Sequence, residues 1–105
     1  MKELFINAIH NKQKIKVTFF AKKYNEDITR ICAPMDFGMS QGKNTKDKSE
    51  KYHLWDFESS SGGHTLPLKP DVIKNIEVLD INFEPSEFVT WNANWIVSRD
   101  WGQFS

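Results

Sequence analysis

The spacing of the hydrophobic residues changes near residue 13. In residues 2–12 the apolar side chains recur at helical spacing and leave one polar side, which predicts a short amphipathic helix. These apolar residues are Leu4, Phe5, Ala8 and Ile9. From Lys14 onward apolar and polar residues alternate, which is typical of a half-buried strand. Its inward side chains are Ile15, Val17 and Phe19. Because so short a helix is marginal on its own, we expect packing to hold it.

Alternating segments recur along the rest of the chain. The sequence predicts further strands at residues 28–34, 52–58, 64–68 and 76–83. Pro34 has no N–H group for a sheet ladder, so it indicates a strand end, an edge or a bulge. Pro70 and Asp71 predict a single helical turn before the last strand, with Asp71 as its cap. Because that last strand is apolar on both faces, we expect it in the centre of the sheet.

Polar segments separate these strands and decide the fold class. Residues 21–27 and 59–63 read as turns, and residues 38–51 as a long, mobile, lysine-containing loop. Too few helices lie between the strands to connect a parallel sheet. The sequence therefore predicts an α+β, mainly β fold, in which an N-terminal helix precedes a small, strongly bent, five-stranded antiparallel sheet or barrel.

An aromatic-rich segment follows the last strand. We expect residues 1–88 to form the sheet domain and residues 89–105 to form a C-terminal extension. Large aromatic surfaces are usually buried, either on the same chain or against a partner such as a second copy. Both alternatives remain open from the sequence. The candidate interface residues are Phe88, Trp91, Trp95 and Trp101.

Composition limits the setting of this domain. A chain of 105 residues fits one domain. Cys32 is the only cysteine, so no intrachain disulfide can form, and we expect a reducing, cytoplasmic location. The sequence contains no run of about 20 apolar residues and no signal-peptide pattern, so we expect no membrane association.

The formal net charge is zero, but the charges are unevenly distributed. Residues 11–51 contain ten Lys or Arg and five Asp or Glu, whereas residues 52–105 contain three and eight. The basic half offers a surface to an anionic partner. The zero total argues against a protein that coats DNA non-specifically.

Catalytic and metal-binding patterns are missing from the sequence. His10, Cys32, His53 and His64 lack the paired spacing of a zinc site. No phosphate-binding loop, GxSxG turn or HExxH helix occurs. We therefore predict a protein that is not an enzyme and has no metal or cofactor.

The candidate binding chemistry centres on Arg30. Its guanidinium is a planar donor suited to phosphate or carboxylate, and neighbouring strands of a curled sheet could place His53 beside it. Aromatic rings next to cations bind single-stranded nucleic acid by stacking and phosphate contact. The opposing interpretation, with Arg30 paired to an acid and Trp55 in the core, stays open. The candidate ligand-binding residues are Arg30, His53, His64, Lys14, Lys16 and Trp55.

The order of these segments resembles the WYL domain, a small Sm-like β-barrel of bacterial transcription regulators and phage-defence proteins. The resemblance covers about Leu4 to Phe88 and includes the helix, the strand ending in Phe19-Phe20, and an Arg-x-x-x-Pro pattern at residues 30–34. Residues 52–54, Tyr-His-Leu, match the name-giving Trp-Tyr-Leu, and residues 64–69 match an arginine-rich strand but contain no arginine.

This resemblance implies a non-catalytic regulatory or sensing module that binds a nucleotide, a nucleic acid or another anionic small molecule. In the family such modules relay binding to an attached DNA-binding domain. The alternative hypothesis is a protein-interaction or homodimerisation module that uses the C-terminal extension.

Overall fold

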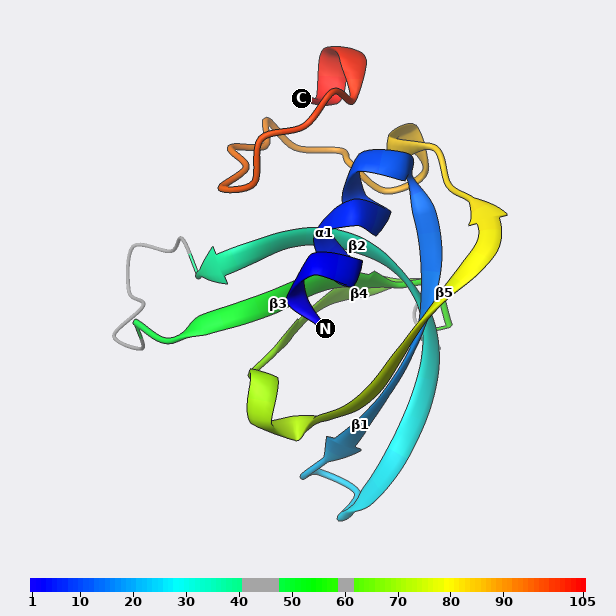
Figure 1. Ribbon diagram of the computed structural model, residues 1–105, viewed down its shortest axis with the longest axis vertical. Coiled ribbons are helices and arrows are strands. Elements are labelled where there is room, and N and C mark those ends of the chain that lie inside the picture. The colour runs from blue at the N-terminus through cyan, green and yellow to red at the C-terminus, as the bar shows by residue number, and fades with distance from the viewer. Residues whose placement is uncertain (41–47, 59–61) are drawn as a thin grey trace.

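A computed structural model describes residues 1–40, 48–58 and 62–105 (Figure 1). One helix, five strands and three 3-10 turns follow one another along the described chain. They are α1 (Lys2–Asn11), β1 (Gln13–Ala21), β2 (Glu26–Met39), β3 (Glu50–Asp56), β4 (His64–Leu68), η1 (Pro70–Val72), β5 (Ile73–Asn82), η2 (Pro85–Glu87) and η3 (Gly102–Phe104). The strands form one antiparallel sheet, which confirms the predicted α+β, mainly β fold.

The sheet bends at the middle of β2. Its strand order is β4-β3-β2-β1-β5. The first half of β2 pairs with β1 and its second half pairs with β3, and the two ladders overlap only at Cys32, which lies opposite both Ile15 and Asp56. The curvature of β1 and β2 is visible in Figure 1. No pairing joins β4 to β5 within the described residues, so the sheet is open and not a closed barrel.

Three predictions about the strands and their connections are wrong. The strand of residues 76–83 corresponds to β5, which within the described ranges pairs only with β1 and lies at the edge of the sheet. Apolar residues on both faces of a strand depend on what packs above and below it, whereas the place of the strand in the sheet depends on main-chain pairing. Helix α1 contacts β5, and Ile81 of β5 is 52% exposed. The second strand continues past residue 34 to Met39, so its predicted end is wrong, whereas the register shift between Pro34 and Asp36 agrees with the bulge that Pro34 also indicated.

The third concerns the connections. Strand β2 begins at Glu26, inside the predicted turn of residues 21–27. Strands β2 and β3 also occupy both ends of the predicted loop of residues 38–51. Residues 41–47 of that loop and residues 59–61 of the next turn lie outside the described residues.

Two aromatic clusters pack on opposite faces of β3. Tyr52 contacts Phe5 of α1 with ring centroids 4.9 Å apart and Phe37 of β2 at 4.8 Å. Trp55 stacks on Phe88 at 5.7 Å. Because Tyr52 and Trp55 are an odd number of residues apart in one strand, their side chains leave opposite faces. Helix α1 therefore lies on the Tyr52 side of the sheet, where it contacts β1, β2 and β5, and the chain after β5 packs on the Trp55 side.

Candidate functional site

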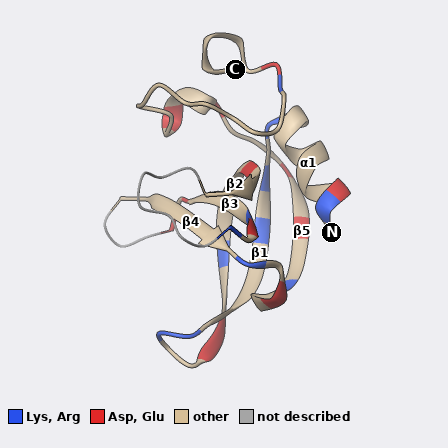
Figure 2. Cartoon of the chain, turned by 90° about the vertical axis from the view of Figure 1, so that its left-hand side faces the viewer, with Lys and Arg blue, Asp and Glu red and all other residues tan. Residues whose placement is uncertain are grey.

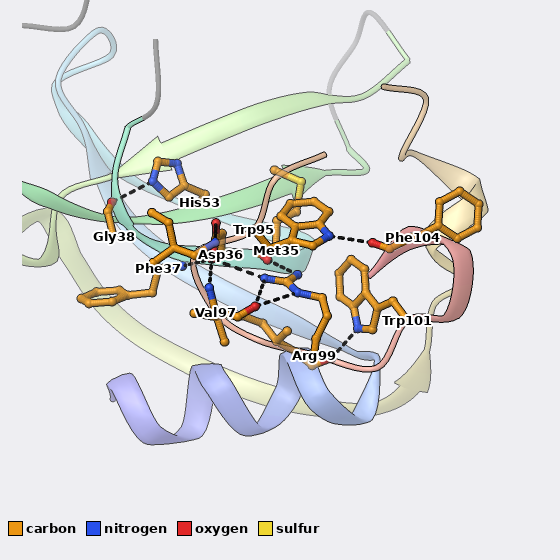
Figure 3. Close-up of polar contacts among 12 residues, drawn as sticks. Met35, Asp36, Phe37, Gly38, His53, Trp95, Val97, Arg99, Trp101 and Phe104 are labelled. Carbon is orange, nitrogen blue, oxygen red and sulfur yellow. Dashed lines mark hydrogen bonds and ion pairs between the residues drawn. The ribbon is translucent and has the colours of Figure 1, made fainter. Parts of the chain in front are cut away.

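The C-terminal extension is joined to β2 by the buried carboxylate of Asp36 (Figure 3). Its Oδ2 accepts a hydrogen bond from the backbone N–H of Ile96 at 2.9 Å, and its Oδ1 accepts one from Val97 at 2.9 Å. The backbone N–H of Phe37 donates to the same Oδ1 at 3.0 Å. Arg99 adds an ion pair, with Nη2 3.3 Å from Oδ1. One side chain thus binds two backbone amides and a cation of a segment some sixty residues later in the chain.

The guanidinium of Arg99 is enclosed by aromatic rings. It lies 4.1 Å from the ring centre of Trp95 and 4.4 Å from that of Trp101, and its side chain is 0% exposed. It also donates to the carbonyl oxygens of Val97 and Met35. Burial lowers its pKa to about 10, against the opposing effect of the Asp36 carboxylate, so Arg99 remains charged at neutral pH. The extension is therefore held by an ion pair and two cation–π contacts.

Two indole N–H groups complete this attachment. Trp101 donates to the carbonyl oxygen of Ile9 at the end of α1, at 2.9 Å, and Trp95 donates to the carbonyl oxygen of Phe104 at 2.7 Å. A buried indole generally needs such a partner for its N–H group. These bonds fix the ring planes that enclose Arg99.

A cleft of about 440 Å³ lies between the extension and strands β2, β3 and β4. The extension contributes residues that are mostly aromatic or amide-bearing, and the strands contribute thioethers, small residues and one imidazole. Its lining residues are Met35, Asp36, Met39, Ser40, His53, Thr65, Leu66, Pro67, Trp91, Asn92, Asn94, Trp95 and Ile96. This volume is within the range of pockets that hold small organic ligands.

The described residues of the cleft carry few charged groups. Among the described residues that line it, two have ionisable side chains, Asp36 and His53, and the carboxylate of Asp36 is neutralised by Arg99. Nε2 of His53 is 2.9 Å from the carbonyl oxygen of Gly38. Because a carbonyl can only accept, that nitrogen carries the proton. The cleft therefore presents apolar rings, thioethers, amides and an imidazole.

The structure does not bring Arg30 and His53 together. Nε of Arg30 forms an ion pair with Oδ2 of Asp56 at 3.5 Å, and the Arg30 side chain is 34% exposed. Asp56 and His53 are three residues apart in β3, so they face opposite sides of the sheet. His64 lies opposite Asp56 in the β3–β4 register and thus falls on the side of Arg30.

The remaining predicted ligand-binding residues are also dispersed. Lys14 lies 4.5 Å from the ring centre of Phe57, and Lys16 is paired with Glu77 of β5 in the register. Trp55 stacks on Phe88 and does not line the cleft. Figure 2 shows the Lys positions of β1 and acidic positions on the neighbouring strands. Of the predicted set, only His53 lines the cleft.

The predicted interface residues divide into buried and accessible ones. Phe88 is 2% exposed and Trp101 is 3% exposed, both within the protein's own core. Trp95 lines the cleft and contacts Trp91, which is 43% exposed. The alternative in which the extension packs on its own sheet therefore describes most of its aromatic surface.

Sequence reasoning missed the groups that build the cleft. Neither Asp36 nor Arg99 was a candidate, and neither were the amides of Asn92 and Asn94. Asp36 follows an apolar run of β2, where a carboxylate needs a partner. That position, with Arg99 between two tryptophans, is the signal that could have identified the pair.

Other chemistry finds little support in the part of the chain that the structure describes. No group of three or more His, Cys, Asp or Glu side chains lies close enough there to hold a metal ion. Cys32 is fully buried, and this burial, followed by the charges of Asp56 and Glu58, raises the pKa of its thiol. A thiol in this state is a poor nucleophile. Among the described helices, none is long and apolar enough to cross a membrane.

Comparisons of the chain with models of known protein families, with characterised proteins and with solved structures found no match.

Proposed function

We propose that this protein is a non-catalytic binding module and that its ligand occupies the cleft between the C-terminal extension and strands β2–β4. The observation that carries the proposal is the cleft itself, with about 440 Å³ bordered by aromatic, thioether and amide side chains. Its two sides are already joined through Asp36 and Arg99. A site that is formed before binding spares the ligand the cost of ordering it.

The lining favours a ligand that is compact, largely apolar and uncharged. The larger share of the exposed lining is apolar and includes Met35, Trp91 and Trp95. A cation placed there would lose hydration without gaining a counter-charge, because the carboxylate of Asp36, the only one among the described lining residues, already binds Arg99. The anionic ligand expected from the sequence would instead require Arg30, which lies on the other face of the sheet and is paired with Asp56. A nucleotide would suit this cleft only through its base.

The four tryptophans provide a direct test of this location. Trp91 and Trp95 line the cleft, whereas Trp55 and Trp101 do not. We expect neutral fragment-sized compounds to shift the indole N–H signals of the first two in NMR spectra and leave those of Trp55 and Trp101 in place. Trp91→Ala should weaken this binding, and Arg30→Ala should not. The proposal would be contradicted if the compounds shifted only NMR signals near Arg30 and if these shifts disappeared in Arg30→Ala.

A second candidate function is the protein-interaction role predicted for the C-terminal extension. Three apolar side chains at the cleft are substantially exposed: Met39 at 48%, Trp91 at 43% and Ile96 at 47%. Such a patch is typical of a contact surface. If it joins two copies, light scattering should show a dimer that Trp91→Ser converts to monomer. A wild-type monomer at high concentration would contradict self-association.

A further inference from the structure

We infer that the ligand of this cleft is a small, neutral, aromatic molecule that donates a hydrogen bond to Nδ1 of His53. This inference rests on the function proposed above and names the chemical class of the ligand.

A hydrogen bond to the backbone orients the imidazole of His53. His53 belongs to β3 and lines the cleft, and its Nε2 donates to the carbonyl oxygen of Gly38 at 2.9 Å (Figure 3). Gly38 has a φ of +145°, a conformation that other residues rarely adopt. A Cβ at this position would lie 2.6 Å from Cδ1 of Ile96. The absence of a side chain at Gly38 therefore allows Ile96 to pack closely against the backbone whose carbonyl oxygen binds His53.

The other ring nitrogen of His53, Nδ1, can accept a hydrogen bond. A neutral imidazole carries one proton, and here it is on Nε2, so Nδ1 presents a lone pair. No hydrogen bond to Nδ1 exists among the described residues. The residues directly opposite His53 in the two neighbouring strands are Asp36 and Pro67. The carboxylate of Asp36 is an acceptor, and Pro67 has no N–H group, so neither side chain can satisfy Nδ1.

The same cleft that His53 lines also has an apolar surface of defined shape. The rings of Trp91 and Trp95 lie 6.2 Å apart at an interplanar angle of 67°, so they form a corner. A flat ring can stack on one indole and direct its edge at the other, which is a favoured aromatic geometry. The thioethers of Met35 and Met39 also line the cleft, and sulfur makes favourable contacts with aromatic rings. A planar ring with an N–H or O–H group at its edge meets all of these features.

The test compares two probes of the same shape, indole and benzofuran, which differ in whether the five-membered ring carries an N–H donor or an oxygen acceptor. Their affinities are measured from the shifts of the Trp91 and Trp95 indole signals. Because one hydrogen bond contributes about 1 kcal/mol, we expect indole to bind about fivefold more tightly than benzofuran. In His53→Phe the two compounds should bind equally. The Trp55 and Trp101 signals report whether the variant retains the fold.

Three outcomes would overturn the inference, and they separate it from the proposed function. Equal affinities of indole and benzofuran for the wild-type protein would refute the donor to His53 while leaving the cleft as a binding site. Tighter binding of saturated cyclohexanol than of indole would refute an aromatic ligand and also leave the cleft as a site. If none of the three compounds shifts the Trp91 or Trp95 signal, both the inference and the proposed location of the ligand are wrong.

Discussion

The two faces of strand β3 are covered in different ways. On the Tyr52 face lies α1, a regular helix that satisfies its own backbone and contributes fully buried side chains such as Phe5 and Ile9. On the Trp55 face lies the C-terminal extension, which has little regular structure. The carboxylate of Asp36 in β2 binds the backbone amides of Ile96 and Val97 in this extension. Buried backbone N–H groups need a hydrogen-bond acceptor, and here a side chain provides it instead of the main chain of a sheet or helix.

This difference accounts for the cleft on the Trp55 face. A helix packs a continuous apolar stripe and leaves little space beneath it. The C-terminal extension is anchored by Trp101, which binds α1, and by Arg99, which binds Asp36 of β2. Its residues Trp91, Asn92 and Asn94 line the cleft together with residues of β4, and Trp91 is partly exposed. Binding sites commonly form where a rigid scaffold positions such a segment.

The largest expected effect on stability tests whether α1 and the C-terminal extension contribute equally to the core. We expect Phe5→Ala and Trp101→Ala each to lower the free energy of unfolding by about 3–5 kcal/mol, because each removes a large buried ring. Denaturant titration followed by circular dichroism measures both. If Trp101→Ala costs less than about 1 kcal/mol while Phe5→Ala has its full effect, the extension is an appendage and not a second layer.

The next effect concerns the ion pair that only the irregular face uses. Arg99→Met retains apolar contact with the two indoles but leaves the Asp36 carboxylate buried without a cation, which should cost about 3 kcal/mol. The matched control is the double variant with Asp36→Asn, which removes the uncompensated charge. We expect the double variant to be more stable than Arg99→Met alone. A double variant that is less stable would show that the charge of Asp36 is not the cause.

A smaller effect tests the contact of Gly38 with Ile96. Gly38→Ala should cost about 1–3 kcal/mol, because it combines an unfavourable φ with a close approach to the Ile96 side chain. Gly62→Ala is the control, since Gly62 also has a positive φ, of 90°, but nothing lies within 4 Å of the position that its Cβ would occupy. In urea titrations Gly38→Ala should be the less stable variant. Equal losses would mean that backbone strain alone is responsible.

The smallest effect on stability should come from the ligand surface. Trp91→Ala removes a ring that is 43% exposed, so we expect a change of about 0.5 kcal/mol in unfolding free energy and a clear loss of ligand affinity. Arg30→Ala should leave the affinity of the cleft unchanged. A large loss of stability in Trp91→Ala would instead assign this ring to the core.

The fold was predictable because it depends on nearby residues. Alternation around Ile15 and Val17 and helical spacing around Phe5 report which side of an element is buried, and each pattern is complete within a few residues. The lateral position of β5 was not predictable in this way, because main-chain pairing leaves no trace in the pattern of apolar side chains. The extent of β2 beyond Pro34 depended on a bulge, which one proline alone does not specify.

The candidate site was predictable only in part, and His53 is the part that was found. Charge and residue type suggested Arg30 as its neighbour, but the pleat of β3 puts Asp56, the partner of Arg30, on the face opposite to His53. The resemblance to WYL domains and the predicted regulatory role stay predictions.

The sequence by itself determined the elements of this protein and their buried sides, since local periodicity encodes both. Only the tertiary structure decided how the C-terminal extension is held and where the cleft lies. Asp36 and Arg99 are far apart in the chain, and their attraction has meaning only once the sheet has bent and the extension has crossed it. A buried ion pair depends on distance and desolvation, and neither quantity can be read from the order of residues.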